Sequence, residues 1–68
     1  MRLANARQMF RIGDRVAISP KGVRNHVEKQ GVEGSVIGFS TRSECLIRVL
    51  RDGLKCASTY HIDFWEKQ

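Results

Sequence analysis

The dipeptide Asp52-Gly53 is the feature that most constrains how this chain of 68 residues can fold. It stands between two segments with the character of β-strands, residues 45–51 and 54–59. An Asp-Gly pair in that position is the strongest short-range signal for a hairpin closed by a two-residue turn of the primed type. The sequence therefore predicts an antiparallel hairpin in the second half of the chain.

The register of this hairpin predicts which side chains face the core. With a two-residue turn, Val49 lies opposite Cys56, and alternate residues of each strand share one face. The other orientation would bury Arg48 and Lys55 without partners, which is energetically expensive. Ile47, Val49 and Cys56 are therefore expected to face inward, and the two cations to face outward.

The two cysteines, Cys45 and Cys56, are expected to remain reduced. In the predicted register they lie four residue pairs apart, roughly 13 Å at the rise of a β-strand, whereas a disulfide needs Cα atoms within about 7 Å. The spacing of these cysteines, His26 and His61 matches no zinc-binding pattern. The sequence therefore predicts neither a disulfide, nor a metal site, nor another cofactor.

Five short strands are predicted in all. Their expected ranges are 12–19, 32–39, 45–51, 54–59 and 63–66. Ser19-Pro20-Lys21-Gly22 predicts a turn, residues 23–30 a polar loop and residues 40–44 a hairpin loop. Residues 1–11 are predicted to be an N-terminal tail or a short helical turn without a clear cap.

The inward positions predict a thin core. Its expected members are Ile12, Val16, Ile18, Val36, Ile47, Val49, Cys56, Ile62 and Phe64, with Leu3 or Phe10 available to seal one end. These elements favour an all-β, five-stranded small barrel over residues 12–68, because closing the sheet removes exposed strand edges.

The composition narrows the class of protein. Lys and Arg number 12 against 7 Asp and Glu, the formal net charge is +5, and hydrophobic residues make up 41% of the chain. No apolar run approaches the roughly 18 residues of a membrane span, and residues 1–9 lack the apolar segment of a secretory signal. A single cytoplasmic domain with no membrane contact is expected.

Several motifs resemble SH3-like barrels of the KOW type. The runs Gly13-Asp14-Arg15-Val16, Pro20-Lys21-Gly22 and Gly34-Ser35-Val36-Ile37-Gly38 resemble the KOW strands and turn, and residues 47–53 resemble the hairpin of Tudor-like barrels. Residues 55–66 are similar to the ends of short uncharacterised phage and prophage proteins. The resemblance implies a small SH3-like barrel in the cytoplasm of a bacterial host, acting in phage or prophage gene expression or replication.

One group of polar residues has the types that catalysis uses. His61 and Asp63 lie on one face of a predicted strand, near the hydroxyls of Ser58, Thr59 and Tyr60. The rest of the chain is too short to add a substrate pocket and an oxyanion hole. A local hydrogen bond is the expected role, so neither enzymatic activity nor a small-molecule substrate is predicted.

The basic residues support the leading functional hypothesis, which is binding of DNA or RNA through phosphates. The predicted nucleic-acid contacts are Lys21, Arg24, Lys29, Arg42, Arg48, Arg51 and Lys55. Phe39, Tyr60 and Trp65 are candidates for stacking on an unpaired base or for contact with a partner. Low sequence specificity is expected, since no segment resembles a base-reading helix. A solvated basic surface that only keeps the protein soluble is the simpler interpretation.

A protein-interaction adaptor, either a modulator of a host transcription or replication complex or a homodimer, is the alternative hypothesis. Ile37, Phe39, Leu46 and Leu50 are predicted to face outward, and an uncovered apolar patch of that kind marks an interface. Trp65 either anchors such a partner or closes the barrel against the N-terminal segment.

Overall fold

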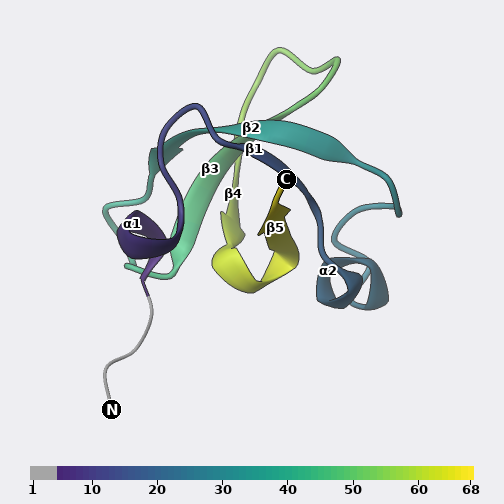
Figure 1. Ribbon diagram of the computed structural model, residues 1–68, viewed down its shortest axis with the longest axis horizontal. Coiled ribbons are helices and arrows are strands. Elements are labelled where there is room, and N and C mark those ends of the chain that lie inside the picture. Colours follow the sequence, from purple (N-terminus) through teal and green to yellow (C-terminus); the bar gives the residue numbers. More distant parts are fainter. Residues whose placement is uncertain (1–4) are drawn as a thin grey trace.

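The computed structural model describes residues 5–68, which form one five-stranded antiparallel sheet with two short α-helices and a 3₁₀ helix (Figure 1). The elements are α1 Ala6–Met9, β1 Arg15–Ile18, α2 Pro20–Arg24, β2 Glu33–Phe39, β3 Leu46–Arg51, β4 Ser58–His61, η1 Ile62–Phe64 and β5 Trp65–Lys67. The strand order is β4-β3-β2-β1-β5, so β4 and β5 are the two edges of an open sheet and not neighbours in a closed barrel. The sheet arches so strongly that β4 and β5 descend on either side of η1 (Figure 1).

The core lies under this arch. Its buried hydrophobic members are Ala6, Phe10, Val16, Ile18, Val36, Ile47, Val49, Ile62 and Trp65, with Phe64 partly buried against them. Two predicted members are wrong. Ile12 is 68% exposed because β1 begins only at Arg15, and Cys56 is exposed in the loop between β3 and β4.

The β3–β4 hairpin is present, but its register differs from the prediction by two residues. Val49 pairs with Ser58 and not with Cys56, so residues 52–57 form a longer loop. Gly53 has a φ of +85°, whereas the φ of Asp52 is negative. This combination fits a type II turn and not the predicted turn of the primed type. A shift of two preserves the faces of a strand, and Val49 is therefore buried as expected.

The turn predicted at Ser19 to Gly22 is the start of helix α2. Ser19 is the N-cap, and its Oγ accepts a hydrogen bond from the N–H of Gly22 at 3.2 Å. The helix ends in a Schellman motif, with His26 at φ +58° and the Val27 N–H donating to the Gly22 carbonyl at 3.0 Å. His26 occupies a left-handed position that usually carries Gly or Asn, which is why the sequence did not indicate this helix end.

The N-terminal segment forms a helical turn that belongs to the core. Asn5 caps α1 by accepting a hydrogen bond from the Gln8 N–H at 3.1 Å, so the predicted absence of a clear cap is wrong. Ala6 is buried, and its N–H donates to the carbonyl of Glu44 at 2.6 Å. Phe10 seals one end of the core, as expected; the alternative, Leu3, lies outside the described residues.

The helices of residues 5–68 are short, and none has the length and apolar character of a membrane span.

Candidate nucleic-acid interface

Ion pairs neutralise most acidic side chains of this basic protein. Arg15 donates to the Asp52 carboxylate through Nη1 and Nη2, at 2.8 and 2.6 Å, and its Nη2 also lies 3.5 Å from Glu33. Asp14 pairs with Lys67 at 3.4 Å. The hydrogen bond from Arg15 lowers the pKa of Asp52, so this carboxylate stays ionised beside its partner.

Glu28 closes a polar network on the core side of the sheet. Its Oε2 accepts hydrogen bonds from Arg51 Nη1 and, at 3.0 Å, from the Tyr60 hydroxyl. The side chains of Arg51 and Glu28 are only 26% and 16% exposed. Burial, and then the contact with Glu28, raises the pKa of Tyr60. Arg51, a predicted phosphate contact, is therefore already paired with a carboxylate of the protein.

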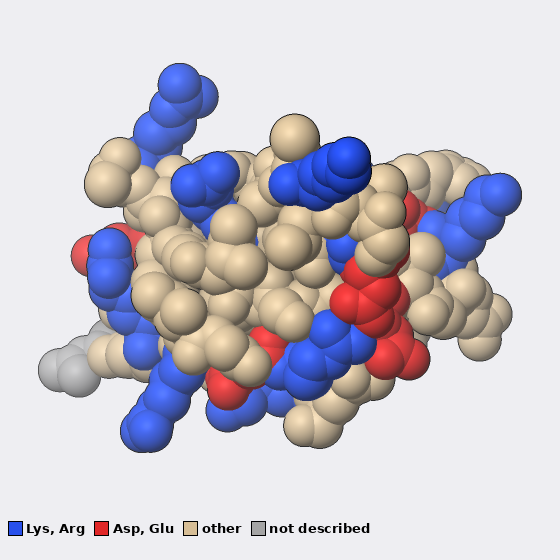
Figure 2. All heavy atoms as spheres, turned by 90° about the horizontal axis from the view of Figure 1, so that it is seen from above, with Lys and Arg blue, Asp and Glu red and all other residues tan. Residues whose placement is uncertain are grey.

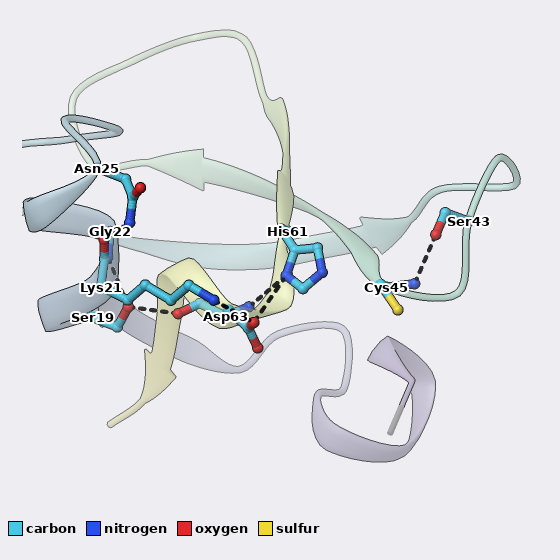
Figure 3. A network of polar contacts seen from close by, with 8 residues as sticks. All are labelled: Ser19, Lys21, Gly22, Asn25, Ser43, Cys45, His61 and Asp63. Atoms are coloured by element: carbon cyan, nitrogen blue, oxygen red, sulfur yellow. Dashed lines mark hydrogen bonds and ion pairs between the residues drawn. The ribbon is translucent and has the colours of Figure 1, made fainter. Parts of the chain in front are cut away.

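A second network joins α2 to the chain after β4 (Figure 3). Lys21 Nζ donates to Asp63 at 2.9 Å, which lowers the pKa of that carboxyl. The Ser19 hydroxyl donates to the Asp63 carbonyl at 2.7 Å, and the Asp63 N–H donates to His61 Nδ1 at 3.1 Å. Lys21 is thus also paired, and His61 makes the local hydrogen bond that the sequence predicts.

The other Lys and Arg side chains of residues 5–68 have no carboxylate within 4 Å. All are exposed, and they are Arg7, Arg11, Arg24, Lys29, Arg42, Arg48 and Lys55. Among the described acids only Glu44 and Glu66 likewise make no ion pair. Figure 2 shows Lys and Arg side chains projecting around the rim of one face of the molecule, whose middle is mostly uncharged.

Five of the predicted phosphate contacts belong to this exposed set, and they come from different parts of the fold. Arg24 lies on α2 and Lys29 in the loop that follows it. Arg42 lies between β2 and β3, Arg48 on β3, and Lys55 in the β3–β4 loop. The cations therefore offer scattered phosphate contacts and not one continuous stripe.

Arg48 occupies the outer face of the sheet among apolar residues. It pairs across the sheet with Thr59, and its strand carries the half-buried Leu46 and Leu50 on the same face. Ile37 of the neighbouring strand is 41% exposed. This face therefore combines exposed apolar side chains with the unpaired cation Arg48, as interaction surfaces do.

The three predicted stacking residues have different environments. Trp65 is 3% exposed and meets Tyr60 edge to face, with ring centroids 5.1 Å apart. Trp65 is therefore a core residue, and its burial argues against the expected contact with a base or a partner. Phe39 is half-buried and predicted to face outward, yet its ring packs against the core, with the guanidinium carbon of Arg7 4.9 Å from the ring centroid.

Arg7 is a residue that the predicted set of contacts left out. It lines a shallow hollow between α1 and the β2–β3 loop, together with Ser40, Thr41, Arg42, Ser43 and Glu44. Figure 1 shows α1 beside this loop. The sequence signal that could have indicated helix α1, which carries Arg7, is Asn5. An Asn before helix-forming residues is a strong N-cap.

No cluster of three metal-ligating side chains is present among residues 5–68. Cys45 and Cys56, both within that range, are not joined by a disulfide. The Cys45 N–H donates to the Ser43 hydroxyl at 3.1 Å (Figure 3), and Cys56 lies exposed in the β3–β4 loop.

Comparison with known proteins gives no match: no family model, no curated protein and no solved structure matches this chain.

Proposed function

We propose that this protein is a small non-catalytic nucleic-acid-binding module of low sequence specificity, acting in phage or prophage gene expression or replication. One observation carries the proposal. Five of the acidic residues are engaged in ion pairs, whereas seven exposed cations within residues 5–68 have no carboxylate partner. Unpaired cations are the groups that release counterions when they meet phosphates.

We also propose that the fold is a variant of the SH3-like barrel. The sheet order β4-β3-β2-β1-β5, the strong arch and the link from β4 to β5 through a single turn of 3₁₀ helix support this proposal. In this view, α1 and Phe10 cover the core where the sheet stays open.

Low sequence specificity follows from the kinds of structural element on which the exposed cations lie. The helices within residues 5–68 are α1, α2 and η1, and none exceeds five residues. The cations on loops and on one strand face can approach phosphates but have no helix to insert into a major groove.

Fluorescence anisotropy with labelled single- and double-stranded DNA and RNA tests this proposal directly. Binding is expected to weaken from about 50 to 300 mM salt, with a log–log slope near −0.9 for each duplex phosphate contacted. The absence of binding to every probe at the lowest salt would overturn the proposal.

A matched pair of lysines makes the test sharper. Lys55→Gln removes a cation without an ion pair, whereas Lys21→Gln removes one that is already bound to Asp63. The proposal expects Lys55→Gln to reduce the magnitude of the slope by about 0.9 and Lys21→Gln to leave it nearly unchanged. Equal effects would mean that only the net charge matters.

The adaptor hypothesis has one specific observation in its favour, the apolar outer face around Arg48. Ile37 is 41% exposed there. Binding through this face would tolerate salt and would be lost in Ile37→Asp, whereas phosphate binding would survive that change.

A further inference from the structure

We infer that the hollow between α1 and the β2–β3 loop binds single-stranded nucleic acid, with an unpaired base on the Arg7 guanidinium and the adjoining phosphate near Arg42. The inference rests on the proposed function and adds the class of strand and its binding site. The hollow has a volume of about 480 Å³ and is open to solvent.

The first support is the pairing of Arg7 with Phe39. The guanidinium carbon lies 4.9 Å from the ring centroid, and Arg7 is exposed. The ring thus lies against the guanidinium, while the Arg7 side chain as a whole stays exposed to a ligand. Arginine planes are stacking surfaces for unpaired bases, and contact with the ring holds this side chain in place before a base arrives.

The second support is the supply of anion-binding groups around this arginine. Arg42 lines the same hollow and makes no ion pair. The hydroxyl of Ser40 accepts from the Arg42 N–H at 3.0 Å, and that of Ser43 accepts from the Cys45 N–H at 3.1 Å. Each hydroxyl still has a hydrogen to donate, and it can donate it to a phosphate oxygen.

The third support is that the site is held together by the fold. The N–H of Ala6 donates to the Glu44 carbonyl at 2.6 Å, which fastens α1 to the loop that carries Arg42. Ala6 itself is buried in the core. Two cations far apart in the sequence are therefore kept at one hollow before any ligand binds.

The other two predicted stacking rings pack against each other. Tyr60 meets Trp65 edge to face, and Trp65 is 3% exposed. Within residues 5–68, Phe39 is the ring that carries an arginine at cation–π distance. A duplex keeps its bases stacked inside and can reach only the cations here, so a single strand gains more from this hollow.

The experiment compares a single-stranded oligonucleotide with its duplex in the anisotropy assay. Arg7→Lys keeps the charge but removes the planar group, and Arg24→Lys makes the same change at an arginine outside the hollow. The expected result is a loss of at least about fivefold in single-strand affinity for Arg7→Lys and less than about twofold for duplex. Arg24→Lys keeps the charge of a proposed phosphate contact and should change both affinities equally and by less than about twofold. The circular dichroism of both variants should be unchanged.

Two further variants address the roles of the neighbours. Phe39→Leu should weaken single-strand binding in the same direction as Arg7→Lys, because the guanidinium loses its support. Glu44→Gln should strengthen binding of both strand types, since it removes the carboxylate that lines the hollow.

The outcomes separate this inference from the proposed function. If the wild type binds both strand types equally and Arg7→Lys matches Arg24→Lys, the inference is wrong while nucleic-acid binding stands. If Arg7→Lys weakens duplex and single strand alike, the hollow is a phosphate contact only. If the wild type binds neither, both proposals fall.

Discussion

Two arginines near opposite ends of β2 have different surroundings. Arg51 pairs across the sheet with Gly34 at the start of β2, and it shares the Glu28 carboxylate with Tyr60. Arg7 lies over Phe39 at the end of β2 and has no carboxylate within 4 Å.

The difference teaches which cations of a basic protein are available to a ligand. A half-buried guanidinium that is paired with a carboxylate is not available to a ligand, because separating the pair would leave a charge in a poorly solvated place. An arginine held only by a ring keeps its charge and its hydrogen-bond donors for a partner. Counting Lys and Arg in the sequence cannot separate these two cases.

The largest effect is expected from removing the carboxylate at the Arg51 end. Glu28→Ala should lower the free energy of unfolding by about 2–3 kcal/mol, because it leaves Arg51 and the Tyr60 hydroxyl without their partner. Urea unfolding measures this change. Glu44→Ala, at an acid without an ion pair, is the matched control and should stay within about 0.5 kcal/mol of the wild type. Equal effects of the two variants would show that the contacts of Glu28 do not stabilise the fold.

A somewhat smaller loss of stability is expected from adding a methyl group at one end of β2, and almost none from adding it at the other end. A Cβ on Gly34 would lie 2.6 Å from the Leu50 carbonyl oxygen, whereas a Cβ on Gly38 meets nothing within 4 Å. Gly34→Ala is expected to destabilise the fold by about 1–3 kcal/mol through overpacking. Gly38→Ala should have little effect on the same urea midpoint, and a comparable loss there would contradict the contrast.

The smallest expected effect is a shift in the pKa of Tyr60, which reports on its contact with Glu28. Tyr60 is the single tyrosine of the chain, so tyrosinate absorbance follows this residue without overlap. Its pKa should lie above the ordinary value of 10.0, and Glu28→Gln should move it back toward that value. A wild-type pKa at or below 10.0 would show that the hydroxyl is not held by burial and Glu28.

The sign of the linked stability change follows from the raised pKa. A group whose pKa is higher in the folded state stabilises the fold at pH values below its unfolded pKa. That contribution is lost as the pH rises through the folded-state value. The free energy of unfolding should therefore fall above pH 10 in the wild type, and fall less in Glu28→Gln.

Much of the fold could be predicted because it depends on short-range patterns. The alternation around Val16 and Ile18, and again around Ile47 and Val49, correctly indicates which side chains enter the core. The positive φ of Gly53 confirms a turn where one was expected.

The errors arise where a local signal admits two outcomes. Ser19 and Pro20 suit both a turn and the start of a helix, and the helix forms because Ser19 also bonds to Asp63 across the fold. Asp52 suits a primed turn, but Arg15 holds its carboxylate from a distant strand. The loop then runs on to residue 57, and Cys56 leaves the core.

The sequence by itself determined a small β-rich domain, the inward and outward faces of its strands, and an excess of positive charge. The period of a strand is two residues and survives a register shift of two, so these properties do not depend on the correct pairing. Only the tertiary structure decided which cations are neutralised, because Arg15 meets Asp52 and Lys21 meets Asp63 across sequence separations of 37 and 42 residues. Long-range pairs of this kind depend on how strands and loops meet in space, and no local pattern encodes that.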